Sequence, residues 1–247
     1  MRFIEPQIIV THHQNIDVDF ITENDAPITM VLIADIHLGP YKSINFLNRA
    51  IKKINALKPD LVIIAGDFLY APKLKQIPQL LAPLANINAP IYAVSGNHDY
   101  DNAEYIQQLK THLPKSIKLL SDKIIKVTIK NKELTIIGLN DLWDGNPNND
   151  LLHQAPPNQN TIAIVHNPDH IKDLTNANID LVVSGHTHGG QIRIPFLYKM
   201  AIPSDFGYDW GYNKEPHTQL YITSGLGETA LPVRFLQPPQ IVVLTLC

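Results

Sequence analysis

The feature that most constrains the fold is a series of short apolar runs, each four to seven residues long, spread along the chain. Runs of this length are typical of β-strands, and those that are apolar at every position predict burial on both faces of a sheet. All are far shorter than the roughly 20 residues that a membrane-spanning helix needs. We predict eight strands, at residues 28–34, 61–65, 91–94, 134–139, 161–165, 181–184, 220–223 and 241–246.

Segments with helical periodicity lie between these strands. Ser43 can cap a helix that ends before Pro59, and Asp101 with Glu104 has the spacing of a capping box. Two prolines interrupt another apolar rhythm, over residues 74–85, which predicts a kinked or broken helix. We predict helices over residues 44–57, 74–85, 101–113 and 168–174. Such alternation of strands and helices is typical of an α/β domain.

Composition narrows the class of protein further. With 247 residues and a hydrophobic fraction of 45%, the chain can bury a substantial core, and we expect a single domain over residues 1–247. The net charge of −3 creates no field that attracts nucleic acid, so sequence-specific nucleic-acid binding is not expected. The single cysteine, Cys247, excludes an internal disulfide and a thiolate zinc cluster. The N-terminus lacks the apolar stretch of a secretory signal, so we expect a cytoplasmic protein without a transmembrane segment.

Two segments are predicted to lie outside the strands and helices. Residues 144–160 carry Gly, Asn and three prolines, which indicates a long surface connection between two sheet-building halves, either a linker or merely a loop. Residues 194–212 hold six aromatic side chains with little periodicity. This aromatic segment either packs over a sheet edge or lines a substrate site, and the sequence favours neither.

Polar side chains follow five of the predicted strands, at the point where each strand ends. In an open sheet, binding sites collect outside the carboxyl ends of the strands, so these segments should converge on one crevice. Carboxylates, amides and imidazoles without sulfur form a donor set that suits Mn²⁺, Fe or Zn²⁺. Seven ligands are too many for one ion and suit two ions that share a carboxylate, as in hydrolases of phosphate esters. The candidate ligands are Asp35, His37, Asp67, Asn97, His166, His186 and His188.

The motifs around these residues resemble the five sequence blocks of the calcineurin-like metallophosphoesterases. The blocks, in the order that the family has them, are Asp35-Ile36-His37, Gly66-Asp67, Gly96-Asn97-His98-Asp99, His166 and Gly185-His186-Thr187-His188. Residues 185–193 and 224–227 resemble the compact bacterial phosphodiesterase and phosphohydrolase branch. The resemblance implies a four-layer α/β/β/α sandwich, with two metal ions between the upper edges of its two sheets.

The resemblance also implies a role for each residue. One ion would be held by Asp35, His37, Asp67 and His188, and the other by Asp67, Asn97, His166 and His186. His98 resembles the family's general acid, which protonates the leaving group after a metal-bridging hydroxide attacks the phosphorus. Asp99 is expected to brace its turn. Arg193 could bind a nonbridging phosphate oxygen of the substrate.

These inferences favour a metal-dependent phosphoric ester hydrolase, most of all a phosphodiesterase that uses Mn²⁺, with Fe or Zn²⁺ as alternatives. The substrate would be a small-molecule or lipid-linked phosphoester. One alternative is a lipid-precursor hydrolase of the UDP-2,3-diacylglucosamine pyrophosphatase type, which would work at the periphery of the inner membrane. A phosphomonoesterase would need a more basic pocket around the same core. A non-enzymatic binding scaffold would have lost metal ligands, whereas every ligand position is filled here.

The remaining six histidines lie outside the motifs. We predict that each is solvated or locally hydrogen-bonded: His12, His13, His112, His153, His170 and His217. Asp141, which follows the fourth predicted strand, either supports the site or forms a plain turn. Asp205 and His217 are weaker candidates for substrate contact, because they lie in or beside the aromatic segment.

Overall fold

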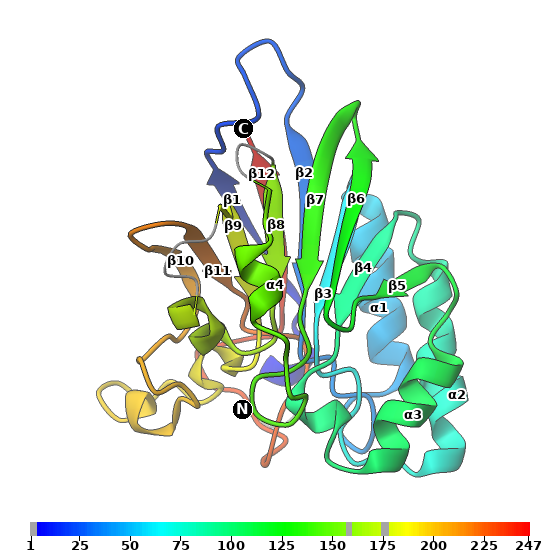
Figure 1. Cartoon of the computed structure of the whole chain (residues 1–247). Helices are drawn as coiled ribbons and strands as arrows, with labels where there is room; N and C mark the ends of the chain where they lie inside the picture. The colour runs from blue at the N-terminus through cyan, green and yellow to red at the C-terminus, as the bar shows by residue number, and fades with distance from the viewer. Residues whose placement is uncertain (1–3, 157–159, 174–177) are drawn as a thin grey trace.

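The computed structural model describes residues 4–156, 160–173 and 178–247, and within these residues the strands form two six-stranded sheets (Figure 1). The first sheet has the order β1 (Val10–Ile16), β12 (Gln240–Leu246), β2 (Ile28–Ile33), β3 (Leu61–Ala65), β4 (Ile91–Val94) and β5 (Ile117–Leu119). The second has the order β10 (Gly211–Lys214), β11 (Gln219–Ile222), β9 (Leu181–Ser184), β8 (Thr161–Ile164), β7 (Lys132–Gly138) and β6 (Lys123–Ile129). Parallel pairing from β2 to β5, and from β7 through β8 and β9 to β11, brings the carboxyl ends of the strands in each set together.

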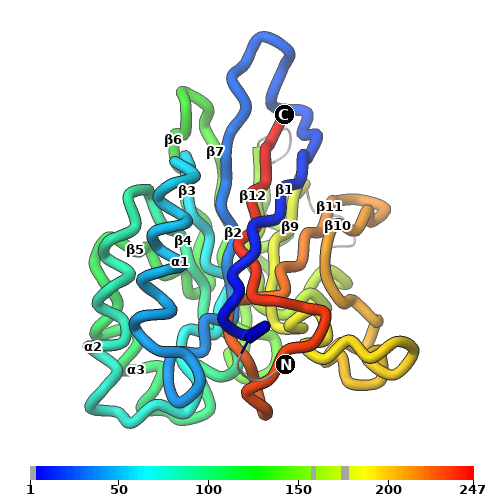
Figure 2. Tube along the Cα trace, turned by 180° about the vertical axis from the view of Figure 1, so that it is seen from behind, coloured from blue at the N-terminus to red at the C-terminus, as the bar shows by residue number. Residues whose placement is uncertain are grey.

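Helices cover the outer faces of both sheets (Figures 1 and 2). The first sheet is covered by α1 (Ile44–Ala56), α2 (Ile77–Leu81) and α3 (Ala103–His112), and the second by α4 (Asp150–His153) and a 3₁₀ helix (Pro168–Asp173). Further 3₁₀ helices lie at Glu5–Gln7, Leu74–Gln76, Ala82–Asn86, Asn97–Asp99, His188–Gly190 and Tyr198–Ala201. Separate clusters of buried apolar residues fill the spaces between successive layers. The α/β/β/α sandwich expected from the sequence is confirmed.

The position of the inner strands explains their continuous apolar runs. In β2, Met30 and Leu32 lie in the space between the two sheets. Val31 and Ile33, on the opposite face, pack beneath the helices of the first sheet. Because both faces are covered, a polar side chain at any of these positions would be buried without water.

The eight predicted strands correspond to the eight inner strands of the two sheets in the described part of the chain. The strands that the sequence does not mark by apolar runs are the four edge strands, β1, β5, β6 and β10. The edge strand β1 is half-exposed along most of its length and reads Val-Thr-His-His-Gln-Asn-Ile, without apolar alternation. Residues 123–132 contain β6 and the turn into β7, and the two strands pair antiparallel.

The described residues of 144–160 lie largely at the surface, as predicted, but the segment does not connect two sheet-building halves, so that part of the prediction is wrong. This segment connects β7 to β8, which are neighbours in the second sheet, and it contains α4. The chain passes between the sheets at residues 120–122, between β5 and β6. This crossing is short, and Leu120 within it is buried between the two sheets. It contains no Gly, Pro or Asn that would mark it as a connection in the sequence. Residues 157–159 lie outside the described residues.

The predicted helices differ from the observed ones mainly at their ends. Ser43 caps α1 as expected, and residues 74–85 are broken into two 3₁₀ helices around α2. However, the side chain that caps α3 is Asn102, which accepts a hydrogen bond from the Glu104 amide, and not Asp101. The helix predicted over residues 168–174 spans Pro168–Asp173, and its predicted last residue lies outside the described residues. In the part of the chain that the structure describes, no helix is long and apolar enough to cross a bilayer.

Candidate metal centre

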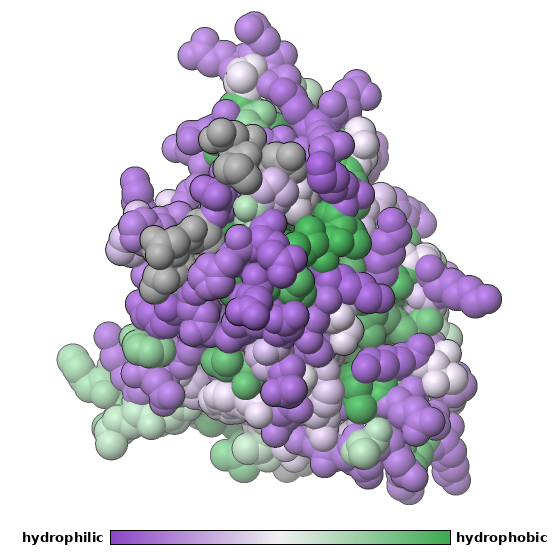
Figure 3. Space-filling model, viewed as in Figure 1, coloured by the Kyte–Doolittle hydropathy of each residue, from purple (hydrophilic) through white to green (hydrophobic). Residues whose placement is uncertain are grey.

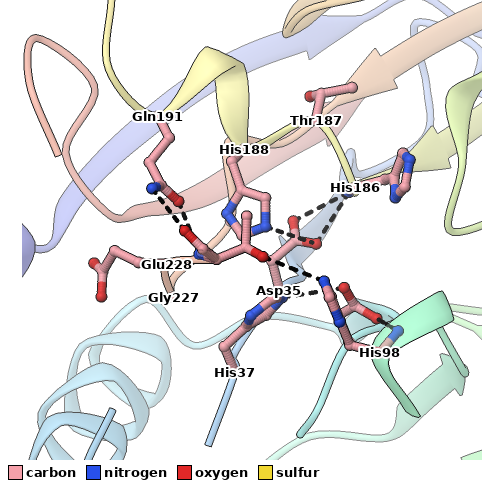
Figure 4. A network of polar contacts seen from close by, with 12 residues as sticks. Asp35, His37, His98, His186, Thr187, His188, Gln191, Gly227 and Glu228 are labelled. Carbon is pink, nitrogen blue, oxygen red and sulfur yellow. Dashed lines mark hydrogen bonds and ion pairs between the residues drawn. The ribbon is translucent and has the colours of Figure 1, made fainter. Parts of the chain in front are cut away.

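All seven predicted ligands lie in loops or short 3₁₀ helices that follow the carboxyl ends of parallel inner strands. Figure 4 labels Asp35, His37, His186 and His188 among them. Asp35 and His37 follow β2, Asp67 follows β3 and Asn97 follows β4, all in the first sheet. The second sheet contributes His166 after β8 and His186 with His188 after β9. Each of the seven side chains is buried, at most 9% exposed, although the loops stand at the edge of the sandwich. The two sheets therefore bring residues separated by more than 150 positions into one cluster.

One group of donors gathers around His37. Donor atoms of Asp35, His37 and His188 all lie within 4.8 Å of one another. His37 Nε2 is 3.0 Å from Asp67 Oδ2, and His188 Nε2 is 3.9 Å from Asp35 Oδ1. The side chains that the resemblance assigns to one ion are therefore adjacent.

The second group gathers around His166. Its Nε2 lies 3.3 Å from Asp67 Oδ2 and 3.2 Å from Asn97 Oδ1. His186 Nδ1 lies 3.0 Å from the same Asn97 oxygen. Asp67 contacts a histidine of each group, His37 and His166, which suits a carboxylate shared by two ions.

The backbone at the ligands is strained. Asp35, His37, Asp67, His186 and His188 all have a positive φ, between 49° and 71°. This left-handed region costs a non-glycine residue energy, and such conformations concentrate at functional sites where the surrounding structure holds them. At Gly66, where φ is +90°, a Cβ would lie 2.5 Å from the ring of His166, so no other residue fits between these loops.

Buried hydrogen bonds hold the ligand loops against one another. The carboxylate of Asp99 accepts hydrogen bonds from the amides of Phe68, Leu69 and Gly96, each at 3.0 Å. Asp67 Oδ1 accepts one from the amide of His98 at 2.9 Å. Asp99 thus braces the turn, as predicted, and it fixes the loop after β3 to the loop after β4.

The charges of the cluster are strongly perturbed. Burial raises the pKa of Asp35 to about 6. Burial alone would also raise the pKa of Asp67, but contacts with His166 and His37 hold it well below its ordinary value. Burial alone would lower the pKa of His166, but Asp67 and Asp35 raise it to about 10. Burial lowers the pKa of His186 to about 3, which keeps that imidazole neutral, the form that binds metal ions.

These residues fit a pair of divalent cations. In the described residues, no lysine or arginine forms an ion pair with Asp35 or Asp67, although both carboxylates are buried. Buried carboxylates require compensating positive charge, and among the described side chains the ionisable groups that pair with these two carboxylates are imidazoles. Within the described part of the chain, three buried ring nitrogens have no hydrogen-bond partner: Nδ1 of His37, Nε2 of His186 and Nδ1 of His188. This combination of imidazoles, an amide and two carboxylates matches the donor preferences of Mn²⁺, Fe and Zn²⁺.

His98 lies at the rim of the cluster and is partly exposed. Its Nδ1 is 2.8 Å from Asp101 Oδ2, and its Nε2 is 3.3 Å from the hydroxyl of Thr229. Burial alone would lower the pKa of His98, but the carboxylates of Asp67 and Asp101 outweigh it and raise that pKa above its ordinary value. A protonated imidazole at the edge of the cluster can deliver a proton to a bound molecule.

A cavity of about 460 Å³ opens beside the cluster. Its polar wall includes Asp67, Asn97, His98, His186 and His188. Its other wall is largely apolar and includes Trp143, Ile192, Ala201, Pro203 and Leu231. The described lining contains no lysine or arginine.

The sequence did not identify three residues of this site, Trp143, Asp101 and Thr229. The indole of Trp143 packs edge-on against His186, with ring centres 4.3 Å apart. Asp141 fixes that position, because its carboxylate accepts hydrogen bonds from the amides of Trp143 and Asp144. No sequence motif marks Trp143 or Thr229, and the capping-box spacing of Asp101 predicts a helix cap there.

Arg193 does not line the cavity. Its guanidinium forms an ion pair with Asp209 at 3.2 Å, donates to the hydroxyl of Tyr198 and to the carbonyl of Gly189, and stacks on the Tyr198 ring. The charge that was predicted to bind a phosphate oxygen is therefore already paired with Asp209. Arg193 instead holds the aromatic segment against the loop after β9.

The histidines outside the site follow the prediction with one exception. His13, His112, His153 and His217 are exposed, and His12 is hydrogen-bonded to the hydroxyl of Tyr221. His170 is fully buried, and neither of its ring nitrogens has a hydrogen-bond partner in the described residues, so the prediction is wrong there. Burial lowers the pKa of His170 to about 4, which keeps it uncharged.

Comparison with known proteins agrees with this geometry. A family model described as calcineurin-like phosphoesterase matches residues 28–190. The chain is 34% identical to the uncharacterized metallophosphoesterase YkuE of Bacillus subtilis, over 99% of this chain and 88% of that protein. It is 29% identical to the phosphodiesterase YaeI of Escherichia coli, over 92% of this chain and 85% of that protein.

Solved structures show the same fold at low sequence identity. The NAD nucleotidase of Haemophilus influenzae superimposes with a TM-score of 0.55 at 19% identity, covering 81% of this chain and 51% of that one. Protein TT1561 of Thermus thermophilus superimposes with a TM-score of 0.52 at 11% identity, covering 81% and 91%. With the motifs, the ligand cluster and the matching family model in agreement, the chain belongs to the calcineurin-like phosphoesterases, a family of metal-dependent phosphoester hydrolases.

Proposed function

We propose that the protein is a phosphodiesterase that works with two divalent metal ions, Mn²⁺ being the first candidate. The observation that carries this proposal is the lining of the cavity, which in the described residues has no lysine or arginine beside the ligand cluster. A phosphate monoester carries up to two negative charges and calls for additional cations, whereas a diester carries one. The largely apolar wall of the cavity suits the second substituent of a diester.

The chain's own residues supply binding, orientation and a proton. Asp35, His37 and His188 would hold one ion, Asn97, His166 and His186 the other, and Asp67 would contact both. When bound, the ions neutralise the charge of the phosphate and activate the attacking water. His98, held at Nδ1 by Asp101, would donate the proton at Nε2 to the leaving oxygen. The hydroxyl of Thr229 lies 3.3 Å from this Nε2 and marks the side on which the leaving oxygen would lie.

Rates on matched synthetic esters test the diesterase proposal. The Mn²⁺-loaded protein should hydrolyse bis(p-nitrophenyl) phosphate with a higher kcat/KM than p-nitrophenyl phosphate. Asp67→Asn should abolish both activities, because it removes a charge from the shared ligand. Elemental analysis should find two transition-metal ions in each wild-type chain. A preference for the monoester would contradict the proposal, and inactivity with both ions bound would favour a binding scaffold.

A second proposal concerns the substrate and follows from the aromatic segment. Phe196 is 94% exposed and Met200 86% exposed, with Leu197 and Phe206 also exposed nearby. The segment that carries them forms the lobe at the lower left of Figure 1, and Figure 3 shows apolar colouring at that place. Exposed apolar side chains concentrated in one segment indicate contact with an apolar partner. A lipid-linked phosphodiester, and work at the periphery of a membrane, would use this surface.

Vesicle experiments test the lipid proposal separately. The protein should cosediment with anionic phospholipid vesicles, and a Phe196→Asp/Met200→Asp variant should not. The same variant should retain wild-type activity on bis(p-nitrophenyl) phosphate, because neither residue lines the cavity. Equal sedimentation of both proteins would reject the lipid proposal and leave the diesterase proposal intact.

A further inference from the structure

A cluster of charged side chains is buried behind the metal ligands, and none of them belongs to the ligand set. Lys42, Glu228 and Arg234 are each at most 1% exposed. Lys42 Nζ lies 2.8 Å from Glu228 Oε1, and Arg234 Nε lies 3.5 Å from the same oxygen. Buried charges are costly, and a hydrophobic trio of similar volume could fill the same space. Their arrangement therefore calls for a reason beyond packing.

The guanidinium of Arg234 donates its hydrogen bonds to backbone carbonyl oxygens. Its Nη2 donates to the carbonyls of Ser224 at 2.9 Å and Gly227 at 2.5 Å, and its Nη1 to that of Gln237 at 2.9 Å. A longer contact reaches the carbonyl of Gly225. The planar fork of arginine can serve several acceptors at fixed angles, which a lysine cannot do. Arg234 thus fixes the path of the backbone over residues 224–227.

That backbone segment is the wall against which two of the metal ligands pack. A Cβ at Gly225 would lie 2.5 Å from Asp35 Oδ2, and a Cβ at Gly227 would lie 2.5 Å from the Cβ of His37. The amide of Leu226 donates to the carbonyl of Ala34, at the end of the strand that carries Asp35. Figure 4 shows Gly227 and Glu228 on the side of Asp35 and His37 away from His98. A small shift of this wall would therefore move both ligands.

The other members of the cluster hold the same wall from outside. Lys42 also donates to the carbonyl of Pro6 at 2.6 Å, and the side chain of Glu5 accepts from the amide of Gln237 at 2.8 Å. Figure 2 shows the N-terminal segment beside the loop that precedes β12. The N-terminal 3₁₀ helix, Arg234 and the wall thus form one connected unit.

We propose that Arg234 is a positioning residue for the first metal ion, acting through the wall at residues 224–227 on Asp35 and His37. This inference rests on the two-ion centre of the proposed function. It concerns geometry and not charge, because the positive charge of a nearby guanidinium would by itself repel a metal ion. Loss of the correct geometry should weaken metal binding, whereas loss of the positive charge should strengthen it. Replacement by Lys, which keeps the charge, and by Met, which removes it, therefore separates the two effects.

Metal binding by Arg234→Lys and Arg234→Met is the test, measured by Mn²⁺ titration and by electron paramagnetic resonance. The wild-type protein should bind two Mn²⁺ ions and show the spectrum of a spin-coupled pair. In both variants, the ion at Asp35 and His37 should bind at least tenfold more weakly, whereas the other ion should bind as in the wild type. At subsaturating Mn²⁺ these variants should therefore show the spectrum of a single, uncoupled ion. Lys126→Met is the control, because Lys126 pairs with Glu133 on the β6–β7 hairpin and contacts neither the wall nor the N-terminal 3₁₀ helix.

Two other outcomes of this titration would contradict the proposal. Tighter binding by Arg234→Met, with Arg234→Lys unchanged, would show that Arg234 acts through charge. Parallel loss of both ions, with a lower melting temperature of the metal-free variants, would show a merely structural role. If neither variant folds, the Nε–H resonance of Arg234 in the wild-type protein should shift on Zn²⁺ binding, and no shift would overturn the proposal. A wild-type protein that binds fewer than two ions would instead contradict the proposed function.

Discussion

Asp101→Asn removes the negative charge that faces His98 and keeps an oxygen that can accept a hydrogen bond. The contact between His98 Nδ1 and Asp101 Oδ2 is 2.8 Å long, and a charge-assisted hydrogen bond contributes about 1.5–3 kcal/mol. The Asp101 side chain is 43% exposed, so screening by water reduces this to about 1–1.5 kcal/mol. That loss corresponds to roughly a tenfold fall in rate for a step that depends on the orientation and charge of His98.

The assay compares two leaving groups on the Mn²⁺-loaded protein. A dialkyl phosphodiester releases an alkoxide, which needs a proton from the general acid, whereas bis(p-nitrophenyl) phosphate releases a stable phenolate. Asp101→Asn should lower kcat about tenfold on the dialkyl ester and less than twofold on the nitrophenyl ester. His98→Ala should show the same contrast more strongly, by about 10²- to 10⁴-fold on the dialkyl ester.

Equal losses on both esters would refute this reasoning, because a general displacement of the site affects every substrate alike. Glu104→Gln is the matched control. It removes a carboxylate from the first turn of α3, where only the backbone amide of Glu104 takes part in capping. This control should leave both rates unchanged.

Three further outcomes follow from the structure. Asp99→Ala leaves three buried amides without an acceptor and should lower the free energy of unfolding by about 3–6 kcal/mol in urea denaturation; a loss below about 1 kcal/mol would contradict the bracing role. Trp143→Ala should raise KM for bis(p-nitrophenyl) phosphate about tenfold with kcat nearly unchanged, and a fall in kcat alone would argue against the apolar wall. Burial lowers the pKa of Lys42 from 10.5 to about 8, so between these values the unfolded chain binds more protons. The free energy of unfolding of the metal-free wild type, relative to Lys42→Met, should therefore rise with pH in that window, and a flat difference would contradict this.

The sequence predicts the inner strands because burial on both faces requires apolar residues at consecutive positions. The edge strands show no such apolar runs. In β1, His13 and Asn15 face solvent, and the strand exists because its backbone pairs with β12, more than 200 positions away. Pairing between backbones is independent of side-chain type, so a half-exposed edge strand cannot be recognised from side-chain patterns.

The same distinction separates the predicted and unpredicted parts of the site. The metal ligands are determined by residue type and by their place after strands, and both are visible in the sequence. Trp143 reaches the cavity because Asp141 folds its loop back, and Thr229 reaches His98 from a loop 131 positions away. Asp101 illustrates local competition, because the neighbouring Asn102 caps α3 equally well and leaves Asp101 to bind His98. Arg193 is the opposite case, a residue that the sequence predicts for the site but that the structure pairs with Asp209 outside the cavity.

The division of ligands between the sheets links the metal centre to the stability of the sandwich. Both carboxylates, Asp35 and Asp67, come from the first sheet, whereas His166, His186 and His188 come from the second. Attraction between the carboxylates and His166 therefore acts across the junction of the two sheets. The two sheets approach each other closely at Gly185, because a Cβ there would lie 2.4 Å from the Cβ of Ala34, which follows β2 of the first sheet. Cations bound between these loops would join the sheets at the end of the sandwich that holds the strained backbone of the ligands, so metal binding and the pairing of the two sheets would stabilise each other.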